Sequence, residues 1–421
     1  MAIQSCIKRS DPKVFRRVYM KRRQSGGEYE TDWQQIPDHR IMGFGSVSRG
    51  IDDIKVNWYS YSGLSLKFQN NDGYFSDETD DKSFFYGYMT RYRTLVKIEA
   101  GYVDADGTTE LPTTAAQYIG LIDEDMKYQQ DNIISFKTNH ISTIFQEFPA
   151  DRITGLGATQ TASDIITKIR DYQDAGATKY FQKYISLGAW SIASTTQNYN
   201  MGTTTTLQGM SCWELMKKLA EAENKLMYVS RDGNFNFVAK TAVSATVYHF
   251  SGVGDDDKTY GRNILKQISV DENIRQVYNR VEITYDTNSS LYVRNETWQW
   301  GDSSSSFYFG VRKYQYENAF MGSTVATSIA DTIYNEFKWP KQLVRLETKF
   351  VPHLELRDEV TLTYKTTVYS GEALWDHATY GTSLWGERSG KNINIDNVEY
   401  KIEKISHDFD HFKSNLELKE I

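Results

Sequence analysis

The sequence predicts a mainly β protein of the α+β class, in which two small antiparallel β-barrel domains flank an α/β insertion. Apolar and polar residues alternate in many short runs along the chain, which is the pattern of half-buried strands. Aromatic residues make up 14% of the 421 residues, and 29 residues are Tyr. This composition favours pleated sheets and wide protein interfaces. The strongest helical pattern lies in the middle of the chain, between two strand-rich regions.

Composition argues against several classes of protein. The formal net charge is −7, so the chain has no overall basic field to hold nucleic acid. Cys6 and Cys212 are far apart, which predicts reduced thiols instead of a disulfide framework or a structural zinc site. The N-terminus lacks the apolar segment of a signal peptide, and no apolar run approaches the roughly 18 residues that a membrane span needs. We therefore expect synthesis and folding in a cytoplasm, without membrane insertion.

Residues 1–150 are predicted to form the first β-barrel domain. Val14–Arg22 alternates apolar and basic residues, and Leu64–Phe68 alternates in the same way. Asn71–Gly73 follows as a turn, because Asn and Gly tolerate a positive φ. Three further strands complete the predicted meander: Arg93–Tyr102, Gln117–Asp123 and Ile133–Thr138.

Residues 151–260 change to the helical period and are predicted to form an α/β insertion domain. Thr161–Asp164 can cap a first helix, which continues into a stripe of isoleucines. Ser211 can begin a second helix, with Glu214 placed to complete a capping box. The segment Asn224–Val238 then has the pattern of a hairpin that turns on an Asp-Gly pair.

Residues 261–421 are predicted to form the second β-barrel domain. Val277–Tyr285 alternates as a strand, and Asp302–Ser306 has the composition of a solvated loop. Gly322–Lys338 places an apolar residue at every fourth position, which indicates a helix. Two more strands follow, at Leu343–Phe350 and Glu359–Tyr364.

The end of the chain is predicted to be an antiparallel hairpin that closes a sheet. Apolar and charged residues alternate from Val398, and a slip between Ile402 and Ile405 predicts a bulge. Asp408–Ser414 is polar and turn-like, and Leu416–Ile421 alternates again as the returning strand.

A Trp-rich loop at residues 369–391 interrupts the second barrel. It carries Trp375, Tyr380 and Trp385 among Gly and Ser residues. An aromatic loop of this kind usually packs on a surface, so these three residues are the candidate interface. Three interpretations stay open for it: packing against its own domain, contact with another subunit, and sugar binding.

No catalytic motif is recognisable. GxSxG, P-loop, HExxH and dinucleotide-binding patterns are all missing from the sequence. His407 and His411 could share one face of a strand and hold a metal ion, but they fall at a polar turn where exposed His and Asp are common. We therefore predict no catalytic residue, no cofactor and no metal site. A carboxylate pair for glycoside hydrolysis stays open, since spacing alone does not exclude one.

Several of these strands together resemble a known family. The pattern Tyr400-x-Ile402-x-x-Ile405-Ser406-His407 in the last hairpin is similar to the closing strands of the tail hub proteins of tailed phages and related contractile injection machines. The strand that begins at Val277 resembles the one that opens the second barrel of these proteins, and the meander from Val96 to Ile122 resembles their first barrel.

The resemblance implies a structural virion protein of the tail or baseplate, not an enzyme, synthesised in the host cytoplasm. In this family three copies associate so that six similar barrels form a ring, which joins the sixfold tail tube to a threefold spike or tail tip. The implied partners are two further copies, tail tube and distal tail proteins, and a central spike or tail-tip protein. DNA would pass through the ring without sequence-specific binding. Two alternatives stay open: a tail-tip protein that contacts a host surface receptor through the Trp-rich loop, and a cell-wall glycan hydrolase.

Overall fold

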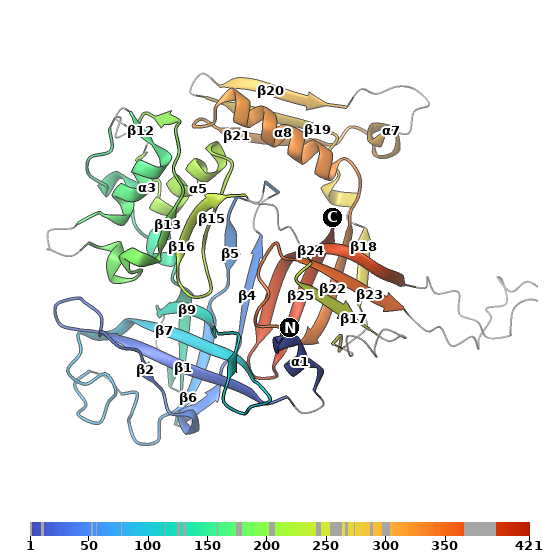
Figure 1. Cartoon of the computed structure of the whole chain (residues 1–421). Helices are drawn as coiled ribbons and strands as arrows, with labels where there is room; N and C mark the ends of the chain where they lie inside the picture. Colours follow the sequence, from blue (N-terminus) through green and yellow to red (C-terminus); the bar gives the residue numbers. More distant parts are fainter. Residues whose placement is uncertain are drawn as a thin grey trace, which may run out of the picture.

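The computed structural model of the chain shows a mainly β protein built around two large, curled sheets, with two smaller α/β units beside them (Figure 1). The structure describes residues 2–9, 12–51, 54–55, 57–76, 78–113, 115–123, 127–128, 132–157, 159–173, 179–201, 207–240, 246–252, 263–265, 268–272, 274–286, 289–296, 304–365 and 393–421. Within these ranges no helix is long and apolar enough to cross a membrane. Cys6 and Cys212 are buried free thiols, as predicted.

The first large sheet, sheet A, contains all the strands predicted for the first barrel. Its strands lie in the order β3-β6-β11-β9-β7-β1-β2, with β8 on β7 and β10 on β11. The bounds are β1 (Val14–Arg23), β2 (Gln34–Gln35), β3 (Ile41–Gly43), β6 (Leu64–Gln69), β7 (Thr90–Val103), β8 (Glu110–Leu111), β9 (Ala116–Ile122), β10 (Lys127–Tyr128) and β11 (Ile133–His140). The short helices α1 (Ala2–Lys8) and η1 (Asp38–Arg40) accompany them. In β6 every second side chain is buried, as its alternation predicts.

The second large sheet, sheet B, is closed by the predicted C-terminal hairpin. Its strands lie in the order β18-β22-β25-β24-β23-β17, and β17 is the one strand on this path that pairs in parallel. The bounds are β17 (Tyr248–Ser251), β18 (Ser269–Glu272), β22 (Gln342–Lys349), β23 (Glu359–Lys365), β24 (Asn394–Asp408) and β25 (Lys413–Glu420). The register of β24 against β25 shifts between Ile402 and Lys404, which confirms the predicted bulge.

Two strands from the first part of the chain join sheet B. They are β4 (Ser46–Ile51), which pairs with β24, and β5 (Tyr59–Tyr61), which pairs with β4. The positions at which the chain divides into domains stay a prediction, but these pairings show that a segment from the first part of the chain is built into sheet B.

The insertion between the sheets is an α/β unit with both predicted helices. Thr161 and Ser211 cap them, and each completes a capping box with the acidic residue three positions on. The elements are α2 (Thr143–Gln146), η2 (Ala150–Arg152), β12 (Gln160–Thr161), α3 (Ala162–Arg170), η3 (Phe181–Lys183), η4 (Leu187–Ala189), β13 (Trp190–Ile192), β14 (Asn198–Tyr199), α5 (Cys212–Ala222), β15 (Lys225–Val229) and β16 (Phe235–Ala239). The predicted hairpin on Asp232-Gly233 is β15–β16.

A second small unit follows β18. It is a three-stranded sheet, β20-β19-β21, with one helix packed on it. Its elements are η5 (Ile274–Gln276), β19 (Arg280–Tyr285), β20 (Ser290–Asn295), α7 (Ser305–Phe309), β21 (Lys313–Asn318) and α8 (Ser323–Phe337). The predicted solvated loop is wrong at Ser305 and Ser306, which are buried in the first turn of α7. Glu296 accepts hydrogen bonds from both of their backbone N–H groups, at 3.1 and 2.7 Å, and so compensates for their burial.

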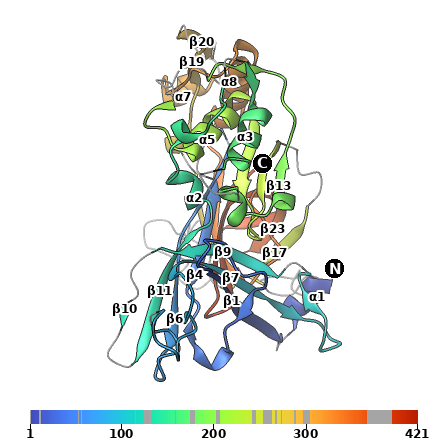
Figure 2. The ribbon, with the colours of Figure 1, turned by 90° about the vertical axis from the view of Figure 1, so that its left-hand side faces the viewer.

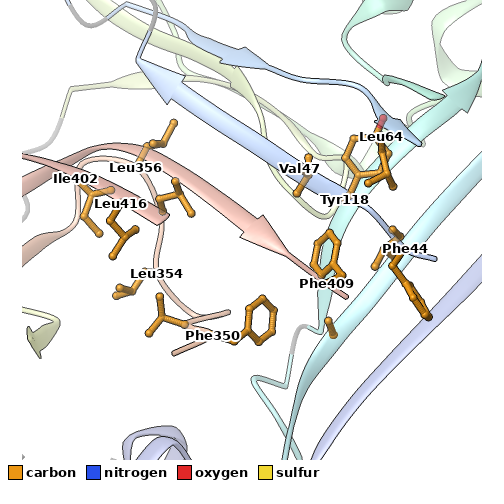
Figure 3. Close-up of a cluster of buried hydrophobic side chains, with 14 of the residues drawn as sticks. Phe44, Val47, Leu64, Tyr118, Phe350, Leu354, Leu356, Ile402, Phe409 and Leu416 are labelled. Atoms are coloured by element: carbon orange, nitrogen blue, oxygen red, sulfur yellow. The ribbon is translucent and has the colours of Figure 1, made fainter. Parts of the chain in front are cut away.

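Sheets A and B share one hydrophobic core. Side chains from both sheets point toward one another in Figure 3, among them Phe44, Val47 and Tyr118 from the first part of the chain and Phe409 and Leu416 from the last hairpin. All seven residues of β9 are buried, because Ile119 and Leu121 on its other face pack against the α/β insertion. The two sheets therefore form one packed body and not separate domains on a linker.

Candidate assembly interface

The predicted interface residues Trp375, Tyr380 and Trp385, with the whole Trp-rich loop at 369–391, lie outside the described residues. Their role stays a prediction. The junction between sheets A and B is described, and it shows how two such units contact each other within one chain.

A strand that crosses between the sheets makes the backbone part of this junction. β4 follows β3 of sheet A, yet it pairs with the second half of β24 in sheet B, with Ser46 opposite Asp408 and Gly50 opposite Lys404. On its other side this half of β24 pairs with β25. Both edges of the hairpin strand β24 are therefore covered at this level.

The turn of the last hairpin fixes the end of this junction. The carboxylate of Asp410 accepts hydrogen bonds from the backbone N–H groups of Phe44 (2.9 Å) and Gly45 (3.0 Å). Arg16 of β1 donates to the carbonyl of Phe409 at 2.6 Å, and its guanidinium lies 3.6 Å from Asp410. Hydrogen bonds to a charged group are stronger than neutral ones, so this turn holds sheet B against β1 and β3.

Aromatic rings surround these polar contacts. The guanidinium of Arg16 lies over Phe44 at 4.4 Å and over Phe412 at 5.4 Å. Phe350 packs edge-on against Phe409 and Phe412, with ring centroids 6.1 and 5.8 Å apart. Phe44, Phe350 and Phe409 are buried in the core that Figure 3 shows. The side chains of Arg16 and Asp410 are still 35% and 36% exposed, so these rings cover the charged contacts only in part.

Buried charges lie where the insertion meets the junction. Glu355 accepts a hydrogen bond from Arg49 at 2.6 Å and pairs with Arg231 at 2.9 Å. The side chain of Arg49 is only 4% exposed, so its charge depends on this partner. The neighbouring carboxylate of Asp358 accepts from the backbone N–H of Glu355 at 2.8 Å. Burial raises the pKa of Asp358 to about 6.

The histidines that the sequence places together have different surroundings. His407 is buried and bonds to the Ser414 hydroxyl through Nδ1 at 2.9 Å, and burial holds its pKa well below the ordinary value. His411 is exposed and contacts Asp408 at 2.8 Å. The prediction that both sit at an exposed turn is therefore wrong for His407, because β24 extends to Asp408 and turns that side chain into the core. Among the described residues no group of His, Cys, Asp and Glu could hold a metal ion.

Sequence reasoning missed the residues that make this junction. Arg16, Phe44, Arg49 and Glu355 are single residues in ordinary strand and loop patterns, and no local motif marks them. The one residue that could have pointed to this junction is Gly45. Its φ is +66°, and an added Cβ would lie 2.6 Å from the Ser65 carbonyl, so the backbone requires glycine there.

An exposed aromatic patch on the second small unit was also missed. Phe307, Tyr308 and Val311 at α7 are 46, 62 and 69% exposed, and Trp339 at the end of α8 is 38% exposed. The ring centroids of Tyr308 and Trp339 are 6.0 Å apart. Exposed aromatic clusters of this kind are typical of protein contacts.

The two sheets repeat one plan. Along the chain the strands β1, β3, β6, β7, β9 and β11 of sheet A correspond to β17, β18, β22, β23, β24 and β25 of sheet B. In space both sets follow the same order, β3-β6-β11-β9-β7-β1 and β18-β22-β25-β24-β23-β17. One pairing differs in direction, since β1 is antiparallel to β7 and β17 is parallel to β23.

The residues that pair across the strands of sheet A also have counterparts in sheet B, and each counterpart lies the same number of positions further along the chain. Thr138 lies opposite Leu64 and Ile122 in sheet A, and Leu418 lies opposite Val344 and Ile402 in sheet B. Both hairpin turns end on a residue with positive φ, Asn132 at 56° and Phe412 at 50°. The carbonyls of these residues accept equivalent hydrogen bonds from Asn70 (2.7 Å) and Phe350 (3.1 Å). The two hairpins therefore have the same length and the same connection to the preceding strand.

The outer face of sheet B carries a polar hollow of about 580 Å³. Ser48, Ser406 and Asn415 line it, and Arg345 on its wall pairs with Glu417 at 3.1 Å and with Asp271 at 2.6 Å. Short hydroxyl and amide side chains with matched charges give this hollow an interface-like surface. They do not bring together the unpaired acid and base of a hydrolytic site.

No protein-family model matches the sequence, and no curated protein is similar to it in sequence. Solved structures are similar in fold. The tail protein from Neisseria meningitidis has a TM-score of 0.51 at 9% identity, over 97% of this chain and 96% of that one. The 43 kDa tail protein of prophage MuSo2 from Shewanella oneidensis gives 0.48 at 13% identity (96% and 98% covered), and prophage tail protein gp18 from Listeria monocytogenes gives 0.47 at 10% (96% and 94%). The first likeness shows that this chain has the fold of that tail protein throughout.

Proposed function

We propose that the protein is a structural component of a phage tail or baseplate, located in the virion. Three copies form a ring of six similar barrels, and the ring joins the tail tube to a central spike or tail tip. Two observations support this proposal. The fold is that of the Neisseria tail protein over nearly the whole chain, and the two sheets of one chain repeat the same strand order and register.

The repeated sheet plan is the observation that carries the proposal. A chain with two equivalent units occupies two equivalent positions on a circle, so three copies present six such positions. A ring of this kind has sixfold contacts on the face made by the sheets and threefold contacts where the insertions differ. The proposed partners follow from this symmetry: tail tube and distal tail proteins on the sixfold face, and a spike or tail-tip protein on the threefold face. DNA passes through the bore without sequence-specific binding.

The proposed role is not enzymatic. Asp358, His140 and His407, three groups with strongly shifted pKa values, lie at the junction between the sheets. They serve packing there, and burial is the first cause of each shift. The Trp-rich loop is proposed as a further contact between copies, with Trp375 and Trp385 as its anchors.

The mass of the purified protein in solution tests the ring. Light scattering after size exclusion should give three times the chain mass, and averaged electron micrographs of the particle should show six lobes. The same preparation should bind isolated tail tubes. A particle that stays monomeric up to high concentration and also fails to bind tubes would overturn the proposal.

A further inference from the structure

We propose that adjacent copies are joined by backbone pairing between β18 of one copy and β10 of the next, in the way that β4 joins β24 within one chain. This inference rests on the proposed ring and names the strands that close it. It follows from the equivalence of the two sheets. The junction within one chain pairs β4 with the second half of β24, and each of these strands has a counterpart, β18 for β4 and β10 for β24.

In the strand order β18 takes the place of β3, but the contacts equivalent to those of β3 are made by the residues just before it, so β18 itself stands where β4 begins in sheet A. In sheet A the segment before β4 pairs with β6, through Ile41 with Phe68 and Gly43 with Lys67. In sheet B the segment before β18 makes the equivalent contacts with β22: Ile264 bridges Thr348, and the N–H of Leu265 donates to the carbonyl of Glu347 at 2.8 Å. β4 then crosses to the neighbouring sheet, whereas β18 continues along β22 of its own sheet.

β10 holds the place of the second half of β24. Lys127 and Tyr128 of β10 lie opposite Ser135 and Ile134 of β11. The equivalent pairs in sheet B are Ser406 with Asn415 and His407 with Ser414. On the far side, Ser406 and His407 pair with Ser48 and Val47 of β4. Within the described part of the chain, no strand occupies the corresponding side of β10.

Both strands are thus edges whose counterparts are covered. Among the described strands, β18 pairs with β22 alone, and Ser269 and Asp271 on it are exposed. It lies at the margin of sheet B in Figure 1, while β10 and β11 project from sheet A in Figure 2. An open strand edge can pair with a strand of another chain. With one such edge at each end of the molecule, copies associate head to tail, and a closed ring of three copies leaves neither edge open.

The register is obtained by counting along the two equivalent segments. Gly43 and Leu265 face the equivalent residues Lys67 and Glu347, so counting onward makes Ser269 and Val270 the counterparts of Val47 and Ser48. Ser406 pairs with Ser48 and His407 with Val47, so Lys127 of one copy should lie opposite Val270 of the next, and Tyr128 opposite Ser269. Directly opposite residues place their side chains on the same face of a sheet, with Cβ atoms about 5 Å apart, whereas a shift by one residue places them on opposite faces.

Cysteine pairs test both the contact and its register. The in-register pairs are Lys127→Cys with Val270→Cys and Tyr128→Cys with Ser269→Cys, and mild oxidation should convert at least one of them to covalent dimers and trimers on denaturing gels. The recombined pairs, Lys127→Cys with Ser269→Cys and Tyr128→Cys with Val270→Cys, contain the same substitutions on opposite faces. We expect them to cross-link at least tenfold less, and the single variants should give no ladder.

Light scattering on each variant before oxidation separates this inference from the ring itself. Variants that remain trimeric but show no ladder from either in-register pair, or equal ladders from the recombined pairs, would overturn the β18–β10 contact and leave the ring in place. Wild-type protein that is monomeric would overturn the ring. Loss of the trimer in all four double variants, with the wild type trimeric and circular dichroism unchanged, would support these strands as the contact.

Discussion

The carboxylate of Asp410 lies 3.0 Å from the backbone N–H of Gly45, although one residue closes the last hairpin and the other lies near the start of the chain. This contact joins the turn of sheet B to the point at which β4 leaves sheet A. A turn that looks solvated in the sequence is therefore part of the junction between the two sheets.

Replacing Asp410 should weaken this junction. Asp410→Ala leaves the N–H groups of Phe44 and Gly45 without their acceptor and removes the negative charge beside Arg16, and we expect a loss of about 1–3 kcal/mol in the free energy of unfolding. Urea denaturation followed by circular dichroism measures it. His411→Ala, at the exposed neighbouring position, should change stability by less than about 0.5 kcal/mol. Equal effects of the two substitutions would contradict the role of Asp410.

Gly45 should be intolerant of a side chain. A Cβ there would meet the Ser65 carbonyl at 2.6 Å, and the φ of +66° is unfavourable for other residues. Gly45→Ala should therefore destabilise the protein by about 1–3 kcal/mol. Gly107→Ala shares the positive φ, +76°, but has no atom within 4 Å of the added Cβ, so it should cost less. Differential scanning calorimetry of both variants separates the close approach from the backbone strain.

A buried ion pair should fix the two small units against the β4–β5 segment. Lys55 and Glu221 are 2.8 Å apart with side chains only 2% and 5% exposed, and Asn318 of β21 donates to the same carboxylate at 3.0 Å. Lys55→Ala should cost about 3–5 kcal/mol, because it removes the positive charge that faces the buried Glu221 carboxylate. The double variant Lys55→Met with Glu221→Leu should recover most of this loss. A double variant as unstable as the single one would show that packing, not charge, decides the effect.

Local structure was predictable, while the connection between the sheets was not. Short sequence patterns predict the capping residues Thr161 and Ser211 and the bulge after Ile402, because each of these features depends on residues within a few positions. The pairing of β4 with β24 depends on residues more than 350 positions apart, and nothing in the alternation of β4 distinguishes a strand that stays from one that crosses. The burial of His407 has the same origin, because the core that covers it comes from sheet A and from Phe350.

The buried histidines should make the protein sensitive to acid. Burial lowers the pKa of His140 to about 3 and that of His353 to about 4, and it holds the pKa of His407 well below its usual range. These imidazoles are neutral in the folded chain but take up protons near pH 6.5 when the chain unfolds. Their contribution to stability is complete above that pH and is lost as the pH falls toward the folded values.

Asp358 acts in the opposite direction, because its pKa is raised to about 6. Asp358 stabilises the folded chain below about pH 4, the pKa of an Asp in the unfolded chain, and this stabilisation is lost as the pH rises through 6. Between about pH 4 and pH 6 it therefore cancels the pH dependence that one of the three histidines contributes. We therefore expect the free energy of unfolding to fall between pH 7 and pH 4.5, with urea titrations at each pH as the measurement. His140→Gln should remove about 2–3 kcal/mol of that fall, since the substituted side chain takes up no proton on unfolding. A profile that is as steep in the His140→Gln variant as in the wild-type protein would exclude His140 as a source of the acid sensitivity.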